Sequence, residues 1–180
     1  DIIPIPQTMI VNPIENGFIL DNKTVIVSDN PENQFNAEFL QSHLENIFKK
    51  DVEIHVESHR RVSNNSINLN IVDEKQCEEL GLVNDNESYL LSVSLDNINI
   101  YALDAAGIFY GIQTLIQMMP NDVYSDDAEK IAEIDIPCMN INDSPRFKYR
   151  GLMLDCSRTF FDVDFIKHLL NGLAHYKINN

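Results

Sequence analysis

The stretch PRFKYRGLMLDCSRTFFDVDFIKHLLNGLAHYKIN, residues 145–179, decides the fold of the last part of the chain. Within it, residues 149–155 form an almost continuous apolar run that ends in Asp155, and such a run is typical of a parallel strand buried on both faces. Apolar side chains then recur at helical spacing over residues 163–176. The pattern predicts a strand followed by a helix, which is one βα unit.

A turn-rich segment precedes this unit. Residues 140–145 combine Asn, Asp, Ser and Pro, which is the composition of a linker. We therefore expect one domain over residues 1–143 and a second unit over residues 144–180. A parallel strand needs neighbours, and a (β/α)₈ barrel needs about 250 residues. The second unit is expected to be the first strand and helix of a barrel that this chain does not complete.

Residues 1–143 predict an α+β domain with a mixed or antiparallel sheet. Asp96 and Asn97 join two strand-like runs and suit a tight hairpin turn, so those runs should be antiparallel neighbours. A short helical piece is expected at residues 74–80. The strand-like runs are residues 8–11, 17–20, 24–28, 52–56, 67–72, 89–95, 98–102 and 131–139.

Two amphipathic helices are expected beside this sheet. Asn30 with Pro31 can start the first, which continues to Lys50 with Phe35 on its apolar stripe, and Asp104 can cap the second, which Pro120 ends. We predict that both helices pack on the same face of one sheet and that the other face is more polar. The residues placed in that sheet are Ser28, Val56, Val72, Val93 and Ile100.

Composition and charge exclude several functions. Thirteen Lys and Arg against 28 Asp and Glu give a formal charge of -15, which repels nucleic acid and anionic lipid surfaces. No apolar run approaches the ~18 residues of a membrane span, and the first residues lack the layout of a signal peptide. Cys77, Cys138 and Cys156 form no CxxC pair and are interpreted as apolar core residues, so we expect neither metal nor cofactor.

The long stretch at residues 145–179 resembles the opening of the catalytic barrel in β-N-acetylhexosaminidases of glycoside hydrolase family 20. Residues 101–120, YALDAAGIFYGIQTLIQMMP, resemble the last helix of the N-terminal accessory domain of that family, and residues 3–7, IPIPQ, resemble its opening. Two long motifs in the right order make the resemblance specific. It implies an accessory domain followed by the start of a TIM barrel.

The resemblance also implies a reaction. Family members hydrolyse terminal non-reducing N-acetylglucosamine or N-acetylgalactosamine with retention, and the 2-acetamido oxygen of the substrate acts as the nucleophile. The Asp and Glu that assist it lie beyond residue 180 in the family pattern, so we expect no catalytic residue in this chain and no activity from it alone. The expected partners are N-acetylhexosamine-terminated glycans and the remainder of the barrel. The implied location is periplasmic, cell-surface or secreted.

One residue of the chain matches a substrate contact in that resemblance. Arg150 matches an arginine that hydrogen-bonds sugar hydroxyls, a role that suits five rigid N–H donors and a permanent charge. The alternative is a structural arginine paired with Asp155 or with a neighbouring barrel strand. Asp155 and Arg158 are interpreted as a polar network that supports the site. Thr159 stands where the family usually has His, and Cys156 where it often has Val or Thr.

A second function class remains open, namely a stand-alone carbohydrate-binding or interaction module that shares the accessory fold. Residues 146–180 discriminate between this module and a portion of a hexosaminidase, since a stand-alone module has no use for part of a barrel. Their apolar side chains need cover in any case. We expect this segment to dock on the first domain, to be poorly ordered, or, as our first choice, to pair across a homodimer.

Overall fold

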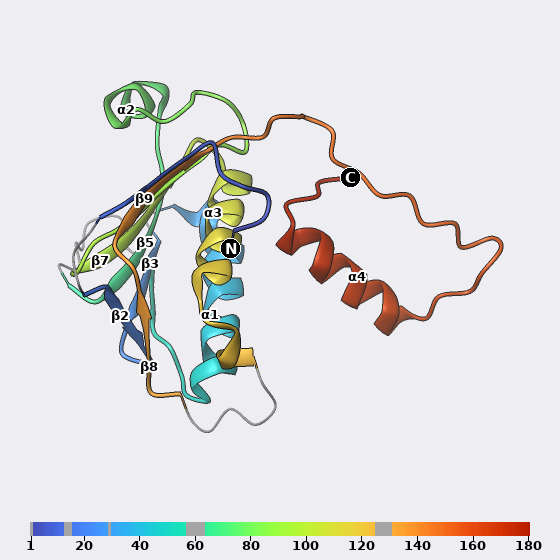
Figure 1. Ribbon diagram of the computed structural model, residues 1–180, viewed down its shortest axis with the longest axis horizontal. Helices are drawn as coiled ribbons and strands as arrows, with labels where there is room; N and C mark the ends of the chain where they lie inside the picture. The colour runs from blue at the N-terminus through green and yellow to red at the C-terminus, as the bar shows by residue number, and fades with distance from the viewer. Residues whose placement is uncertain (1, 13–15, 29, 57–63, 125–130) are drawn as a thin grey trace.

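The computed structural model describes residues 2–12, 16–28, 30–56, 64–124 and 131–180. Figure 1 gives the arrangement of the elements. The strands are β1 (Thr8–Val11), β2 (Phe18–Asp21), β3 (Val25–Ser28), β4 (Ile54–Val56), β5 (Ser66–Ile71), β6 (Tyr89–Val93), β7 (Asn97–Ala102), β8 (Glu133–Ile136) and β9 (Met139–Asp143). The helices are α1 (Gln34–Phe48), α2 (Glu74–Leu80), α3 (Ala105–Met118) and α4 (Val163–His175), with short 3₁₀ turns at Pro31–Asn33 and Asn121–Tyr124.

Seven strands form one mixed sheet in the order β1-β9-β6-β7-β5-β3-β4, and β2 pairs with β8 in a separate two-stranded sheet. The pairs β3–β4, β3–β5 and β5–β7 are parallel, and the remaining pairs are antiparallel. The predicted hairpin is confirmed, because β6 and β7 are antiparallel neighbours. The predicted mixed sheet and α+β class are confirmed as well.

Two predictions at the end of the sheet are wrong. The single strand expected over residues 131–139 is divided at Pro137, which has no N–H for a ladder, into β8 in the small sheet and β9 in the large one. The linker expected at residues 140–145 begins only after Asp143, since β9 runs between β1 and β6. Asn140 and Asn142 belong to this strand although Asn is depleted in strands.

Helices α1 and α3 cover the same face of the large sheet, as predicted (Figure 1). The Asp104 side chain accepts a hydrogen bond from the N–H of Gly107, 2.7 Å away, and so caps α3 as expected. Fully buried side chains such as Leu44, Ile100 and Leu115 fill the space between helices and sheet. Phe35 departs from the predicted stripe: it lies at the start of α1 and is 68% exposed.

The other face of the sheet is polar, which confirms the prediction. Asn68 on β5 donates to the side-chain oxygen of Asn99 on β7, 3.1 Å away, and Asn99 donates to Asn97 at 2.7 Å. Helix α2 covers one end of this face with a small second core around Cys77. Cys77 and Cys138 are buried as expected, whereas Cys156 is exposed.

The C-terminal segment carries the predicted helix but not the predicted strand. Helix α4 forms with Asp162 as its N-cap and lies on the far side of α1 and α3 from the sheet (Figure 1). Residues 149–155 have no regular secondary structure, because a parallel strand needs hydrogen-bonding neighbours on its edges. The carbonyl of Arg150 accepts from the N–H of Asn180 at 3.0 Å, and the N–H of Leu152 donates to the Asn180 carbonyl at 2.9 Å. None of the 13 residues of α4 is buried.

Among the described residues, no helix is long and apolar enough to cross a membrane.

Candidate functional site

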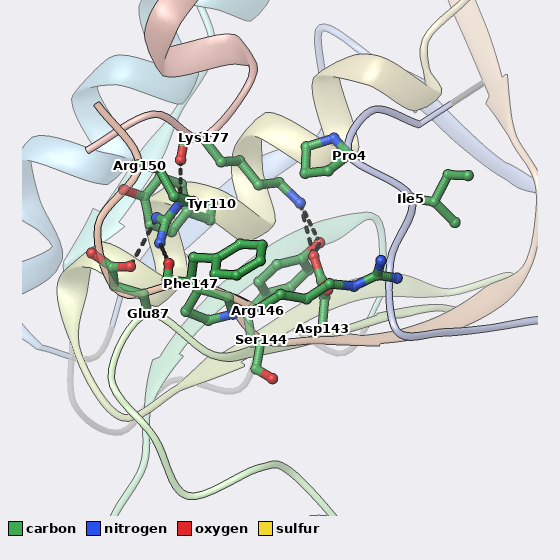
Figure 2. Close-up of a pocket in the computed structure, with 12 residues that line it drawn as sticks. Pro4, Ile5, Glu87, Tyr110, Asp143, Ser144, Arg146, Phe147, Arg150 and Lys177 are labelled. Atoms are coloured by element: carbon green, nitrogen blue, oxygen red, sulfur yellow. Dashed lines mark hydrogen bonds and ion pairs between the residues drawn. The ribbon is translucent and has the colours of Figure 1, made fainter. Parts of the chain in front are cut away.

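A cavity of about 360 Å³ lies where the C-terminal segment meets the end of the large sheet (Figure 2). Its residues come from the N-terminal lead-in, the loop before β6, helix α3, the end of β9 and the segment after it. This is the place where the two predicted units of the chain come together. The lining residues are Pro4, Ile5, Glu87, Tyr89, Tyr110, Asp143, Ser144, Pro145, Arg146, Phe147, Arg150 and Lys177.

Arg150 is held on several sides within this cavity. Its Nε donates to the carbonyl of Lys177 at 2.7 Å, and one terminal nitrogen donates to the carbonyl of Phe147 at 2.8 Å. The other terminal nitrogen pairs with Glu87 Oε2 at 2.8 Å, with 16% of the Arg150 side chain exposed. The guanidinium also stands 5.4 Å from the centre of the Tyr110 ring. Its carboxylate partner is therefore Glu87, not Asp155, and its other two hydrogen bonds go to backbone carbonyls.

Lys177 forms the second polar contact of the cavity. Its Nζ lies 3.1 Å from Asp143 Oδ2 and 2.8 Å from the Tyr89 hydroxyl, as the dashed lines of Figure 2 mark. Tyr89 also donates to Asp143, and its hydroxyl lies 2.7 Å from that of Thr114 on α3. A buried ammonium group needs such partners. The network ties Lys177, two residues beyond the end of α4, to β6, β9 and α3.

Burial changes the acid–base properties of this network. The pKa of the Lys177 ammonium is lowered, mainly because burial disfavours its charged form, although the Asp143 carboxylate acts in the opposite direction. The pKa of the Tyr89 hydroxyl is raised well above its usual value, first by burial and then by the Asp143 charge. Burial thus favours the neutral form of both groups, and the Asp143 carboxylate favours the charged form of Lys177. The cavity therefore offers both hydrogen-bond donors, on Arg146, Arg150 and Lys177, and carboxylate acceptors, on Glu87 and Asp143.

Asp155 and Arg158 lie apart from this cavity. Arg158 Nε stands 3.7 Å from Asp155 Oδ2, and 90% and 45% of the two side chains are exposed. The two side chains lie at the surface, and their role in support of a site stays a prediction. Thr159 and Cys156 beside them are exposed too. Arg150 therefore contacts neither Asp155 nor Arg158 in the structure.

Sequence reasoning missed Glu87, Asp143 and Lys177. Glu87 and Asp143 were two acids among 28, and no periodicity distinguished them from solvated surface. Lys177 offered a weak signal, because it directly follows an amphipathic helix and precedes Ile178. These residues meet only through the tertiary fold, since Asp143 and Lys177 are 34 positions apart in the sequence.

Two models of known protein families match this chain, one over the sheet domain and one over the C-terminal segment. A family model described as glycosyl hydrolase family 20, domain 2, matches residues 1–144. The model of the catalytic domain of the same family matches residues 147–180. Together the two models account for nearly the whole chain.

Individual proteins similar to this chain carry names from the same family. A beta-hexosaminidase of Porphyromonas gingivalis is 32% identical over 179 residues, which is 99% of this chain and 22% of the relative. The N,N'-diacetylchitobiase of Vibrio harveyi is 38% identical over 92 residues, 51% of this chain and 9% of the relative. A mutant Streptomyces plicatus beta-hexosaminidase in complex with its product GlcNAc superimposes with a TM-score of 0.82 at 27% identity, over 99% of this chain and 33% of that one.

The chain thus spans about a fifth of the length of the Porphyromonas relative and a third of the Streptomyces structure. On the match of the domain 2 model to residues 1–144 and of the catalytic model to the remainder, this chain belongs to glycosyl hydrolase family 20.

Proposed function

We propose that the 180 residues are the N-terminal portion of a β-N-acetylhexosaminidase that removes terminal non-reducing N-acetylglucosamine or N-acetylgalactosamine from glycans. The observation that carries the proposal is the order of the two matched family models, domain 2 and then the catalytic domain. The relatives named beta-hexosaminidase and N,N'-diacetylchitobiase support the same substrate class. We further propose the retaining, substrate-assisted mechanism, in which the 2-acetamido oxygen attacks the anomeric carbon.

Residues 144–180 are proposed as the start of the catalytic barrel. The hydrogen bonds from Asn180 N–H to the Arg150 carbonyl and from Leu152 N–H to the Asn180 carbonyl have the alternating pattern of two parallel strands. Helix α4 lies between them in the chain, as in a βαβ unit. Its apolar side chains, exposed in this chain, would be covered by further barrel elements. A stand-alone module would gain nothing from them.

The barrel proposal bears on which arginine contacts the sugar. Active sites of TIM barrels lie at the C-terminal ends of the strands. Arg150 is the second residue of the 149–155 run and is held by Glu87, whereas Asp155 ends that run and Arg158 follows it. The assignment of sugar contact to Arg150 remains a prediction. The geometry favours the alternative that Arg158 contacts the sugar and Arg150 anchors the start of the strand.

A pair of lysine variants in the full-length enzyme discriminates between these assignments. We expect Arg158→Lys to lower kcat/KM at least tenfold with Tm unchanged, because a lysine cannot form the same paired hydrogen bonds. Arg150→Lys should lower Tm and leave kcat/KM of the folded enzyme near the wild-type value. The reverse result would restore Arg150 as the sugar contact.

The reaction itself is tested with an aryl N-acetylglucosaminide. The full-length enzyme should release the β-anomer of N-acetylglucosamine first, as followed by proton NMR, and the 180-residue chain should be inert without an Asp–Glu pair to assist the reaction. General acid catalysis alone typically contributes ~10²- to 10⁴-fold. First release of the α-anomer, or turnover by the purified 180-residue chain, would contradict the proposal.

A further inference from the structure

The cavity at the junction is positively charged in an otherwise acidic protein. Its lining contains three cations, Arg146, Arg150 and Lys177, against the two carboxylates of Glu87 and Asp143. The whole chain carries a formal charge of -15. Two of the cations are paired, Arg150 with Glu87 at 2.8 Å and Lys177 with Asp143 at 3.1 Å. The surplus charge therefore belongs to Arg146.

Arg146 is available for a ligand. Its side chain is exposed and makes no hydrogen bond or ion pair with the residues that the structure describes. In Figure 2 it extends along the cavity next to Asp143 and toward Ile5. The Lys177 ammonium adds a donor, because only two of its three N–H groups have described partners, Tyr89 and Asp143. Both groups line the same cavity.

The walls between these donors are apolar. Pro4 and Ile5 form one side, and the Phe147 and Tyr110 rings contribute to the other. The volume of about 360 Å³ lies within the range of small-ligand sites, which combine mostly apolar walls with a few placed polar groups. An inorganic anion would leave these walls in contact with water. A ligand with both a charge and a hydrophobic or ring-shaped body uses the whole cavity.

We propose that the junction cavity binds a small organic monocarboxylate, with its carboxylate at Arg146 and Lys177 and its ring or apolar body against Pro4, Ile5 and Phe147. Charge-assisted hydrogen bonds to the carboxylate supply the selectivity over neutral molecules of the same shape. The lowered pKa of Lys177 is consistent with this, because a second anion would offset part of the cost of burying the ammonium. The chemistry fits both an aromatic acid and a sugar acid.

The test is an NMR titration of the ¹⁵N-labelled 180-residue chain with two carboxylates, benzoate and glucuronate. Each has a neutral counterpart of the same shape, benzamide and glucuronamide respectively. We expect saturable shifts of the Ile5, Phe147 and Lys177 amide signals with at least one carboxylate, and binding of its neutral counterpart at least about tenfold weaker. The carboxylate that binds more tightly identifies the body of the ligand.

Two variants of equal charge change complete the design. Arg146→Ala should weaken carboxylate binding about tenfold while Tm stays unchanged, because the exposed side chain has no described structural partner. Lys75→Ala removes a charge on α2, whose side chain is 84% exposed and outside the cavity, and should leave the affinity unchanged. No saturation with either carboxylate, equal binding of the neutral counterparts, or equal weakening by both variants would overturn the proposal.

Discussion

Lys177 and Asp143 form a buried ion pair, with Nζ 3.1 Å from Oδ2 and only 6% and 11% of the two side chains exposed. The two residues belong to different parts of the chain, since Asp143 ends β9 and Lys177 follows α4. A buried ion pair adds little net stability over an apolar pair, but loss of one partner leaves an uncompensated charge. The pair therefore joins the C-terminal segment to the sheet, beside the contacts of Arg150 and Asn179 with Glu87.

Replacement of Lys177 should release that segment. We expect Lys177→Met to destabilise the docked arrangement by about 3–5 kcal/mol, because Asp143 stays buried without its cation. The double variant Lys177→Met with Asp143→Asn should lose less stability than the sum of the losses in the two single variants. Hydrogen exchange of residues 176–180 and urea unfolding measure the two effects. Additive losses, or unchanged exchange in Lys177→Met, would show that the pair does not hold the segment.

A second prediction concerns acid stability. Burial, followed by the nearby charge of His175, lowers the pKa of His43, whose Nε2 lies 3.0 Å from the Tyr124 hydroxyl. An unfolded chain binds a proton at this residue near pH 6.5, where the folded chain does not yet bind it. The contribution of His43 to stability is thus complete above about pH 6.5 and is lost as pH falls from there through the folded pKa.

The corresponding variant is His43→Gln, with His168→Gln as a control on the exposed surface of α4. Urea unfolding at pH 7.5 and pH 5 should give a smaller difference in unfolding free energy for His43→Gln than for the wild type. His168→Gln should keep the wild-type difference. If His43→Gln leaves the pH dependence unchanged, the lowered pKa does not contribute to acid instability.

Two helical glycines should respond in opposite directions to alanine. A Cβ at Gly107 would meet the backbone carbonyl oxygen of Ser88 and stand 2.7 Å from the Cβ of Ala102, so α3 could not keep its distance from the sheet. We expect Gly107→Ala to cost about 1–3 kcal/mol. A Cβ at Gly172 in α4 would meet nothing within 4 Å, and Gly172→Ala should gain about 0.5–1 kcal/mol. Thermal unfolding of both variants measures the contrast, and a neutral Gly107→Ala would refute the close packing.

The sequence predicted those parts of the fold that local patterns determine. Capping by Asp104, the hairpin at Asp96 and the stripe that places α1 and α3 on one face all follow from periodicity and turn chemistry, and all are present. Strand β9 was missed because its Asn side chains lie on the outer face of the sheet, and Asn is as frequent in linkers as it is rare in strands. Residues 149–155 have the composition of a strand but lack enough neighbouring strands to pair with. A local sequence pattern cannot show whether such strands are present.

The candidate site was predictable only in part, for the same reason. Arg150 could be singled out from the family motif, but its partner Glu87 lies 63 positions away in a loop without a distinctive pattern. The paired Asp155 and Arg158 are three positions apart, so the sequence could predict their contact. It could not predict their exposure, which depends on what lies beside them in space.

The last prediction concerns the apolar side chains of residues 146–180. Met153 and Phe160 are 87% and 89% exposed, and Leu170 on α4 is 57% exposed. Burial of such a side chain is worth about 1.5–3 kcal/mol, and apolar patches of this kind mark association surfaces. Docking through Lys177 covers one end of the segment and leaves these side chains in water. We therefore expect the 180-residue chain to self-associate through them.

Sedimentation velocity tests this with variants that should not disturb the monomer. Phe160→Ser with Leu170→Ser should convert a concentration-dependent dimer to a monomer, because both side chains are exposed in the single chain and contribute little to its fold. Phe35→Ser, which removes a 68% exposed ring from α1, should leave the dimer intact. A chain ending at Asp143 should be monomeric, though less stable, since Asp143 loses Lys177. Monomers at every concentration for the wild type, or equal loss of the dimer in Phe35→Ser, would mean that the exposed C-terminal side chains do not drive association.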